Sequence, residues 1–230
     1  MVIQFILLIP AAYLIGSIPT AYLVAKWRRG IDIRQYGSGN VGASNVIAVV
    51  SRRWSIPVMI IDVGKGALAV WLAQLAGFGT SQQAIIGFMT IIGHNWTVFL
   101  HFQGGRGIST SLGVITMLAP RVGPIALIVP YLFAPFRLLS LGVVITLVAL
   151  PLLALFLSQP LAIAEPVPVS LAYLAILLLA LVRRLTAPRS PVSTSVPTRE
   201  LVLYRLLFDR DIKDREAWLS QTRTEASSTR

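Results

Sequence analysis

The sequence predicts an all-α integral membrane protein with about seven transmembrane helices, some of them short or broken, and a cytosolic C-terminal helix. Of its 230 residues, 55% are hydrophobic and only 13% are charged, and the mean hydropathy is +0.75, values atypical of a soluble domain. Long apolar stretches alternate with short polar loops, as in polytopic membrane proteins. The net charge is +11, and the basic residues lie beside these apolar stretches. The sequence contains no recognisable nucleic-acid-binding module, so no nucleic-acid partner is expected.

The first predicted span, residues 2–25, contains Gly16-Ser17-Ile18-Pro19. A proline inside a helix removes a backbone hydrogen bond, so a kink is expected there. No charge precedes Lys26, and the apolar run is longer than a signal-peptide core, which indicates a retained helix. A helix needs roughly 17–25 residues to cross a bilayer, so the shorter predicted spans have an alternative interpretation as re-entrant or tilted segments. The later predicted spans are residues 55–77, 84–100, 108–119, 122–136, 141–157 and 168–182.

Basic residues are divided unequally between the two sets of loops. If seven spans alternate across the membrane, the only charged residues in the loops on one side are Arg121 and Glu165. Loops rich in positive charge face the cytoplasm, so we predict a multi-pass cell-membrane protein with its N-terminus outside. The cytoplasmic side then receives Lys26, Arg28, Arg29, Arg34, Arg52, Arg53, Arg106, Arg137, Arg183 and Arg184.

We divide the chain into a membrane domain at residues 1–185, a linker at 186–198 and a cytosolic tail at 199–230. The linker is rich in Pro, Ser and Thr, a composition typical of connecting segments. Apolar residues recur at helical spacing over residues 199–219, which predicts one amphipathic helix. Its i,i+4 ion pairs would be Arg205/Asp209, Asp209/Lys213 and Asp211/Arg215.

A polar segment with regularly placed glycines, residues 37–45, lies between two apolar runs. Its glycines allow positive φ and close approach of the backbone to a ligand, and its side chains supply neutral hydrogen-bonding groups. This combination predicts a cradle for an anion, with a ligand-free loop as the alternative. No G-K-[ST] follows, so it is not a Walker loop. The candidate residues are Gly37, Ser38, Gly39, Asn40, Gly42, Ser44 and Asn45.

A second glycine-rich loop, Gly104-Gly105-Arg106-Gly107, comes directly before the predicted span 108–119. Free N–H groups and the positive end of that helix would face an anion, and Arg106 adds a fork suited to phosphate oxygens. Alternatively, Arg106 only follows the positive-inside pattern. Both glycine-rich loops are predicted on the cytoplasmic side, which favours one shared site.

Polar residues inside the predicted spans or at their ends need a partner or a function. Asp62 and Lys65 share a helix face, and either neutralise each other or direct the ammonium group toward a phosphate. His94 is a structural residue or part of the site. Ser140 supplies a hydroxyl group or caps its helix. The chain has no cysteine, which excludes disulfides, thiolate metal sites and a cysteine nucleophile.

Taken together, these motifs resemble the bacterial acyl-phosphate-dependent glycerol-3-phosphate acyltransferases. The resemblance implies a seven-helix enzyme that transfers an acyl group from acyl phosphate to the sn-1 hydroxyl of glycerol 3-phosphate at the cytoplasmic face, releasing lysophosphatidate and phosphate. Its partners would be these two substrates and membrane lipid, without a cofactor or metal, and we predict a monomer. The matching motifs are Gly16-Ser17-Ile18-Pro19, residues 37–46, Asp62-Val63-Gly64-Lys65-Gly66, Gly93-His94, Gly104-Gly105-Arg106-Gly107 and Ser140-Leu141-Gly142.

The resemblance also implies roles for individual residues. Neither histidine begins a His-x4-Asp pair, so direct attack by the glycerol hydroxyl is expected in place of general-base catalysis by such a pair. The implied catalytic residues are Ser38, Asn40, Lys65 and His94. The implied substrate-binding residues are Gly37, Gly39, Gly42, Ser44, Asn45, Gly104, Gly105, Arg106, Gly107 and Ser140.

Four positions depart from the family's pattern: Ala48, Gln103, Arg184 and Ala187 stand where a basic residue, a lysine, a histidine and an asparagine are usual. Arg52 or Arg53 is a candidate replacement for the first. The departures leave two alternatives open, a divergent non-catalytic paralogue that binds lipid or phosphate, and an anion transporter. For an enzyme, deletion of residues 190–230 is expected to leave activity largely unchanged.

Overall fold

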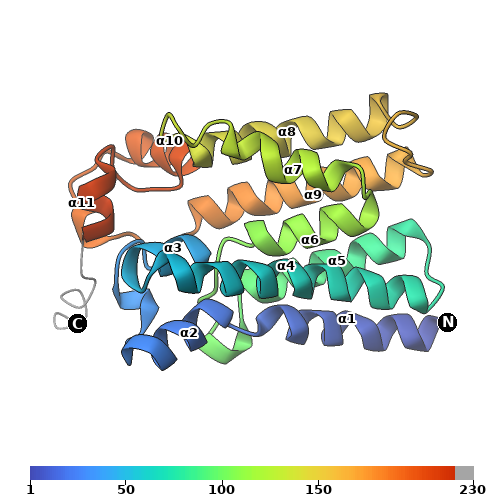
Figure 1. Ribbon diagram of the computed structural model, residues 1–230, viewed down its shortest axis with the longest axis horizontal. Coiled ribbons are helices and arrows are strands. Elements are labelled where there is room, and N and C mark those ends of the chain that lie inside the picture. Colours follow the sequence, from blue (N-terminus) through green and yellow to red (C-terminus); the bar gives the residue numbers. More distant parts are fainter. Residues whose placement is uncertain (221–230) are drawn as a thin grey trace.

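The computed structural model describes residues 1–220, and every regular element in that range is helical. The long helices run side by side along the long axis of the molecule (Figure 1). The predicted all-α membrane fold is confirmed, with two shorter apolar helices, α6 (Ile108–Leu118) and α7 (Val122–Tyr131), packed among the longer ones. Within the described residues, five helical segments are long and apolar enough to cross a membrane: Val2–Arg29, Arg52–Leu75, Thr80–Leu100, Leu139–Phe156 and Pro166–Leu185.

The first apolar segment is broken where the sequence places its proline. α1 (Val2–Ser17) ends before the Ile18-Pro19 step, and α2 (Thr20–Arg29) begins directly after it. Because Pro19 has no N–H, the carbonyl groups at the end of α1 need other donors. Thr97 donates to the Ser17 carbonyl, and Lys65 Nζ donates to the Ile18 carbonyl at 3.0 Å. The break is thus fixed by side chains from two later segments.

The close contact between α4 (Arg52–Leu75) and α6 depends on two glycines. A Cβ at Gly66 would lie 2.1 Å from the Thr110 carbonyl oxygen, and a Cβ at Gly113 would lie 2.0 Å from the Val63 carbonyl oxygen. Only glycine lets two backbones approach this closely. The contact places the start of α6, and the glycine-rich loop before it, beside the polar stretch of α4.

The largest apolar core lies among α6, α7, α8 (Leu139–Phe156) and α9 (Pro166–Leu185). Val114, Leu150 and Tyr173 are buried in it, and the Tyr173 hydroxyl donates to the Ile115 carbonyl at 3.0 Å. Elsewhere, large apolar side chains such as Leu7 are exposed on the outside of the bundle, as expected for helices that face lipid.

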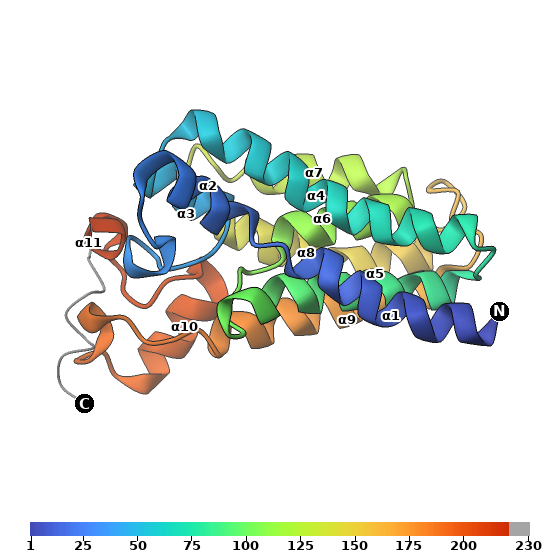
Figure 2. The ribbon, with the colours of Figure 1, turned by 90° about the horizontal axis from the view of Figure 1, so that it is seen from below.

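The connections gather at the two ends of the bundle (Figures 1 and 2). One end holds the N-terminus and the α8–α9 loop, where Thr80 of α5 (Thr80–Asn95) donates to Glu165 at 2.7 Å. The other end holds α2, α3 (Ala43–Val49), α10 (Thr198–Phe208) and α11 (Arg215–Ser220). The basic residues of α2 and those at the end of α9 lie at this second end, as alternation of the spans predicts. Which end faces the cytoplasm stays a prediction.

The tail forms two helices, so the prediction of one helix over residues 199–219 is wrong. α10 (Thr198–Phe208) ends because Asp209 adopts a left-handed conformation, with φ 52° and ψ 40°, and α11 (Arg215–Ser220) follows a turn. The predicted i,i+4 pairs are replaced by longer-range ones, because Arg205 pairs with Asp211 at 2.8 Å and Asp209 pairs with Arg106 at 2.7 Å. The division into domain, linker and tail stays a prediction.

Removing the Asp211 carboxylate is expected to undock α10. The Arg205 and Asp211 side chains are only 6% and 3% exposed, and Asp211→Ala would leave a buried guanidinium without its partner, at a cost of roughly 3–5 kcal/mol. Limited trypsin digestion in lipid should then cut the tail much faster. The matched control, Arg205→Met/Asp211→Leu, removes both charges and should recover most of the protection. Equal digestion rates for Asp211→Ala and the unaltered protein would contradict the role of this pair.

The same pair predicts an acid-induced change in the tail. Burial raises the pKa of Asp211, but hydrogen bonds from Arg205 and from the Ser190 N–H, with the Arg205 charge, outweigh burial and lower that pKa below its usual 3.8. A lowered carboxyl pKa adds stability that is complete above the usual value and is lost as pH falls through the lowered one. Hydrogen exchange in α10, corrected for intrinsic rates, should therefore accelerate only in strong acid. Acceleration near neutral pH would contradict this assignment.

Candidate active site

The first glycine-rich loop, residues 37–42, is built around the buried side chain of Asn45. Asn45 Oδ1 accepts from the Ser38 N–H at 3.1 Å, and Nδ2 donates to the carbonyl oxygens of Ile33 and Tyr36 at 3.2 and 3.1 Å. Gly37 has φ +56° and lies so close to Asn45 that a Cβ would be 2.5 Å from Oδ1. The Asn45 amide is therefore fully used in shaping the loop, although the sequence suggests that it binds substrate.

The second glycine-rich loop packs on the end of α5. The N–H groups of Gly104 and Gly105 donate to the carbonyl oxygens of Asn95 and His94 at 3.2 and 3.0 Å. Arg183 donates to the carbonyl oxygens of both glycines at 2.9 Å. The expectation that these two N–H groups are free to bind an anion is wrong, because closing the loop onto α5 uses them. Their structural role is to place the residue that follows, Arg106.

Gly107 ends this loop and precedes α6. It adopts φ +75°, and its carbonyl accepts from the Ser111 N–H at 2.7 Å, which starts the helix. A side chain at this position would be strained by the backbone alone and would also approach Asn95 Oδ1 to 2.5 Å. The first-turn N–H groups of a helix have no partner within that helix, so the start of α6 brings polar backbone groups to the site.

Asp62, Lys65 and His94 form a buried cluster between α4 and α5. Asp62 Oδ1 lies 2.9 Å from Lys65 Nζ and 3.7 Å from His94 Nδ1, with side chains only 2–8% exposed. The predicted Asp62–Lys65 pairing is present. The Lys65 ammonium also donates to Ile18 at the α1–α2 break, so it ties two helices together. Asp62 and His94 line the larger of two cavities described next.

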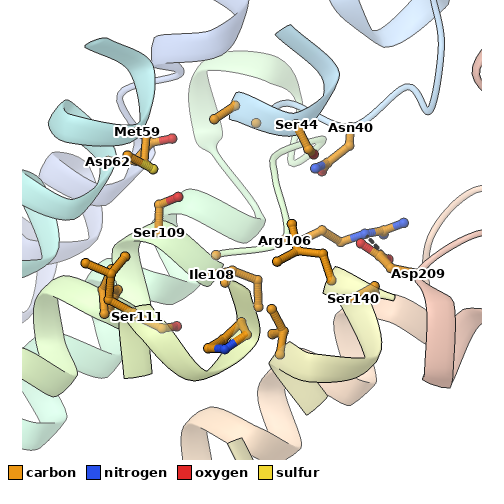
Figure 3. A pocket seen from close by; sticks show the side chains of 18 of the residues that line it. Asn40, Ser44, Met59, Asp62, Arg106, Ile108, Ser109, Ser111, Ser140 and Asp209 are labelled. Atoms are coloured by element: carbon orange, nitrogen blue, oxygen red, sulfur yellow. Dashed lines mark ion pairs between the residues drawn. The ribbon is translucent and has the colours of Figure 1, made fainter. Parts of the chain in front are cut away.

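The larger cavity has a volume of about 500 Å³ and lies among α3, α4, α6, α7 and α8. Figure 3 shows its polar end. Asn40 and Ser44 lie on one side, and Arg106 lies between these two residues and Ser140. Asp62 and Ser109 lie on the opposite side. Most of its remaining wall is apolar. The apolar lining residues include Ile47, Ile56, Met59, Leu112, Ile115, Leu127, Val143 and Leu147.

The smaller cavity, about 310 Å³, has a more polar wall. Asn40 and Arg106 line both cavities, so the two meet at these side chains. Arg34 also lines the smaller cavity and is held by Asp32 at 2.5 Å. Burial raises the pKa of Asp32, but the Arg34 hydrogen bonds outweigh burial and lower it below its usual value. Other lining residues include Ser38, Gly39, Gln103, Gly104, Arg183, Ala187 and Trp218.

Ser140 does not cap α8, because the residue before the helix is Leu138. Its hydroxyl oxygen is buried with no hydrogen-bond partner in the described part of the chain and lines the larger cavity, so it remains available to a ligand. Among the departures from the family's pattern, Ala48 is exposed, whereas Arg52 lines the larger cavity. Arg184 also lines it, and its guanidinium donates to the Leu206 and Ser140 carbonyl oxygens.

Arg106 is the residue at which most of these features meet. Its Nε lies 2.7 Å from Asp209 Oδ1 (Figure 3), and its Nη1 donates to the Arg183 carbonyl at 3.2 Å. The sequence singled out Arg34 and Arg183 only as topology signals, and Asp209 only as part of a tail helix. A charged residue at the end of an apolar helix is a signal that would have identified Arg183. Nothing local in the sequence would have identified Asp209.

No group of three or more His, Asp or Glu side chains in residues 1–220 is arranged to hold a metal ion. The side chains that line the two cavities offer hydrogen bonds and positive charge from arginine to an anionic ligand. That the protein needs no cofactor stays a prediction.

The comparisons with known proteins agree with this geometry. The sequence model of the family described as "Glycerol-3-phosphate acyltransferase" matches residues 6–188. Two relatives come from strains of Dehalococcoides mccartyi. "Glycerol-3-phosphate acyltransferase 4" is 45% identical, and the alignment covers 94% of each chain. "Glycerol-3-phosphate acyltransferase 5" is 42% identical, and the alignment covers 100% of this chain and 98% of the relative. The crystal structure of PlsY in its glycerol 3-phosphate form matches with a TM-score of 0.71 and 31% identity, over 79% of this chain and 88% of that one. The chain therefore belongs to the glycerol-3-phosphate acyltransferase family.

Proposed function

We propose that the protein transfers an acyl group from acyl phosphate to the sn-1 hydroxyl of glycerol 3-phosphate, giving lysophosphatidate and inorganic phosphate. The observation that carries this proposal is the pair of cavities that meet at Asn40 and Arg106. An apolar cavity of about 500 Å³ suits an acyl chain, and a basic, polar cavity of about 310 Å³ suits a small phosphate ester. The reacting groups would meet where the cavities join.

The residues fit this chemistry because an acyl phosphate already carries a good leaving group. The glycerol hydroxyl oxygen attacks the carbonyl carbon, the bond from that carbon to the phosphate oxygen breaks, and phosphate leaves with the electron pair. The hydroxyl proton passes to a phosphate oxygen. Such a reaction requires alignment and charge stabilisation more than a protein nucleophile. Arg106, where the cavities join, would bind the phosphate of glycerol 3-phosphate, and Ser38, Asn40 and Ser44 would hold substrate oxygens.

The buried cluster of Asp62, Lys65 and His94 would form the floor of the reaction site. Asp62 and His94 line the larger cavity, while Lys65 holds Asp62 in place and fixes the α1–α2 break. Arg34 and Arg183 would add positive charge around glycerol 3-phosphate in the smaller cavity. Ser140, with its unpartnered hydroxyl, would bind a substrate oxygen from the start of α8.

The site lies at the end of the bundle that carries the basic helix ends, and the positive-inside rule makes this end cytoplasmic. We propose that the N-terminus is outside, that the active site and tail are cytoplasmic, and that the protein works as a monomer in the lipid bilayer. Acyl phosphate would enter the apolar cavity from the surrounding lipid, and glycerol 3-phosphate would come from the cytosol.

The test is release of inorganic phosphate by the purified protein in a lipid mesophase. Palmitoyl phosphate is supplied with and without glycerol 3-phosphate, beside an active acyltransferase in the same mesophase. Phosphate release that depends on glycerol 3-phosphate and yields lysophosphatidate is the expected result. No turnover, with the control enzyme active, would reject the proposal and favour a non-catalytic paralogue that binds lipid or phosphate.

A further inference from the structure

The tail enters the candidate active site, although the family match ends at residue 188. Asp209 lines the larger cavity and Trp218 lines the smaller one. The Asp209 carboxylate pairs with Arg106, the arginine shared by both cavities, although the two residues lie far apart in the sequence (Figure 3). A segment outside the family match thus supplies a charged partner to a residue at the centre of the site.

The position of Asp209 is set by contacts on both sides of it in the chain. Before it, Arg205 donates to the Leu185 carbonyl at 2.8 Å, and the Leu206 carbonyl accepts from Arg184 at 2.6 Å. After it, Asp211 pairs with Arg205 at 2.8 Å and accepts from the Ser190 N–H at 3.0 Å. These contacts bind the end of α10 to the end of α9.

The backbone at Asp209 is itself unusual. Its left-handed conformation, with φ 52° and ψ 40°, ends α10, and such a conformation is unfavourable for residues other than glycine, although asparagine and aspartate tolerate it best. A chain that only needed to end a helix here would use glycine at no steric cost. Aspartate at this position ends the helix and also directs a carboxylate to Arg106.

Asp209 and the Arg183 carbonyl together restrict the Arg106 guanidinium. Nε faces Asp209 and Nη1 faces the Arg183 carbonyl. Two of the three guanidinium nitrogens are therefore held, and no hydrogen bond from Nη2 is present within residues 1–220. A guanidinium fixed in this way presents its remaining donors without loss of side-chain entropy on binding. Without Asp209, only the single neutral contact to Arg183 would orient it.

The positive charge of the arginines around Arg106 also favours a carboxylate at Asp209. Arg183 and Arg184 lie beside the Arg106–Asp209 pair, and their own hydrogen bonds go to carbonyl oxygens. Three guanidinium groups against one carboxylate leave two positive charges, which a dianionic phosphate would neutralise. With Asp209 absent, these three guanidinium groups would receive no counter-charge from the tail.

We propose that Asp209 is a positioning residue that fixes the Arg106 guanidinium for the substrate phosphate, so that the tail completes the active site. This inference rests on the proposed acyl transfer. It replaces the expectation that deletion of residues 190–230 leaves activity largely unchanged. Point variants are the sharper test, because deletion would also uncover the faces of α8 and α9 on which α10 packs.

The experiment compares Asp209→Ala, Asp209→Asn and Glu216→Ala in the full-length protein, with phosphate release as the readout. Asp209→Ala should raise KM for glycerol 3-phosphate about tenfold while kcat changes less than about threefold, because a binding group is misplaced while the reacting groups remain. Asp209→Asn keeps an oxygen beside Nε but removes the charge, and should recover part of the loss. Glu216→Ala removes a tail carboxylate that is 85% exposed and should behave like the unaltered protein.

A double-mutant cycle with Arg106→Gln separates positioning from general destabilisation. In that background Asp209→Ala should change KM by less than about twofold, because the residue it positions is gone. An equal effect in both backgrounds would overturn the inference. So would an unchanged or lower KM in Asp209→Ala alone, the lower value meaning that the carboxylate competes with substrate phosphate. Absence of turnover in the unaltered protein would instead reject the proposed function, and with it the site that Asp209 would serve.

Discussion

Gly105→Ala should abolish acyl transfer, whereas Gly64→Ala should leave it intact. A Cβ at Gly105 would lie 2.1 Å from His94 Nε2 and 2.6 Å from the Val41 carbonyl oxygen, so the loop must move away from α5. Overpacking of this kind costs roughly 1–3 kcal/mol of stability. The larger consequence is for Arg106, the next residue, because a misplacement of about 1 Å lowers activity roughly 100-fold.

The control uses a glycine of the same chain that has room for a side chain. Nothing lies within 4 Å of a Cβ at Gly64 in α4, and alanine there should stabilise the helix by about 0.5–1 kcal/mol. Phosphate release and thermal unfolding in lipid measure both variants. Gly105→Ala with normal activity would mean that the contact between this loop and His94 does not set the position of Arg106.

Asp62→Ala should destabilise the protein strongly and abolish activity. The change leaves the Lys65 ammonium buried beside the Ile18 carbonyl with no counter-charge, which costs roughly 3–5 kcal/mol. It also removes a carboxylate from the wall of the larger cavity. Thermal unfolding in lipid and phosphate release should therefore both fall.

The double variant Asp62→Asn/Lys65→Met separates the two roles of the pair. Methionine fills a similar volume without charge, so the unfolding temperature should return close to that of the unaltered protein. If the charges serve the reaction, activity stays lost in this variant. Recovery of both stability and activity would show that Asp62 and Lys65 only hold the helices together, and would remove them from the catalytic site.

The helices of the membrane bundle were predictable because their signals are local. Each apolar segment carries its own hydrophobicity, and Pro19 is a local signal for the break in the first one, which Thr97 and Lys65 then hold in place. The tail helix was predicted less well for the opposite reason. Residues 199–219 have a continuous helical pattern, but the helix ends at Phe208 because Asp209 turns toward a partner that lies far away in the sequence.

The sequence predicted which residues form the candidate site better than it predicted what each residue does there. Sequence analysis brought Ser38, Asn40, Arg106 and Ser140 to one end of the bundle, and the structure places each of them on a cavity wall. The glycine N–H groups of the second loop were misjudged, because their partners on α5 cannot be seen from the loop's own sequence.

The sequence by itself determined the family, the apolar helices and the residue types available for phosphate binding, since composition, spacing and hydrophobicity are properties of short segments. Only the tertiary structure decided which polar groups are already paired and which remain open to a ligand. Asn45 is used in its own loop, Lys65 closes a helix break, and Asp209 holds Arg106. Each of these outcomes depends on hydrogen bonds and ion pairs between groups distant in sequence, whose geometry is fixed only when the helices pack.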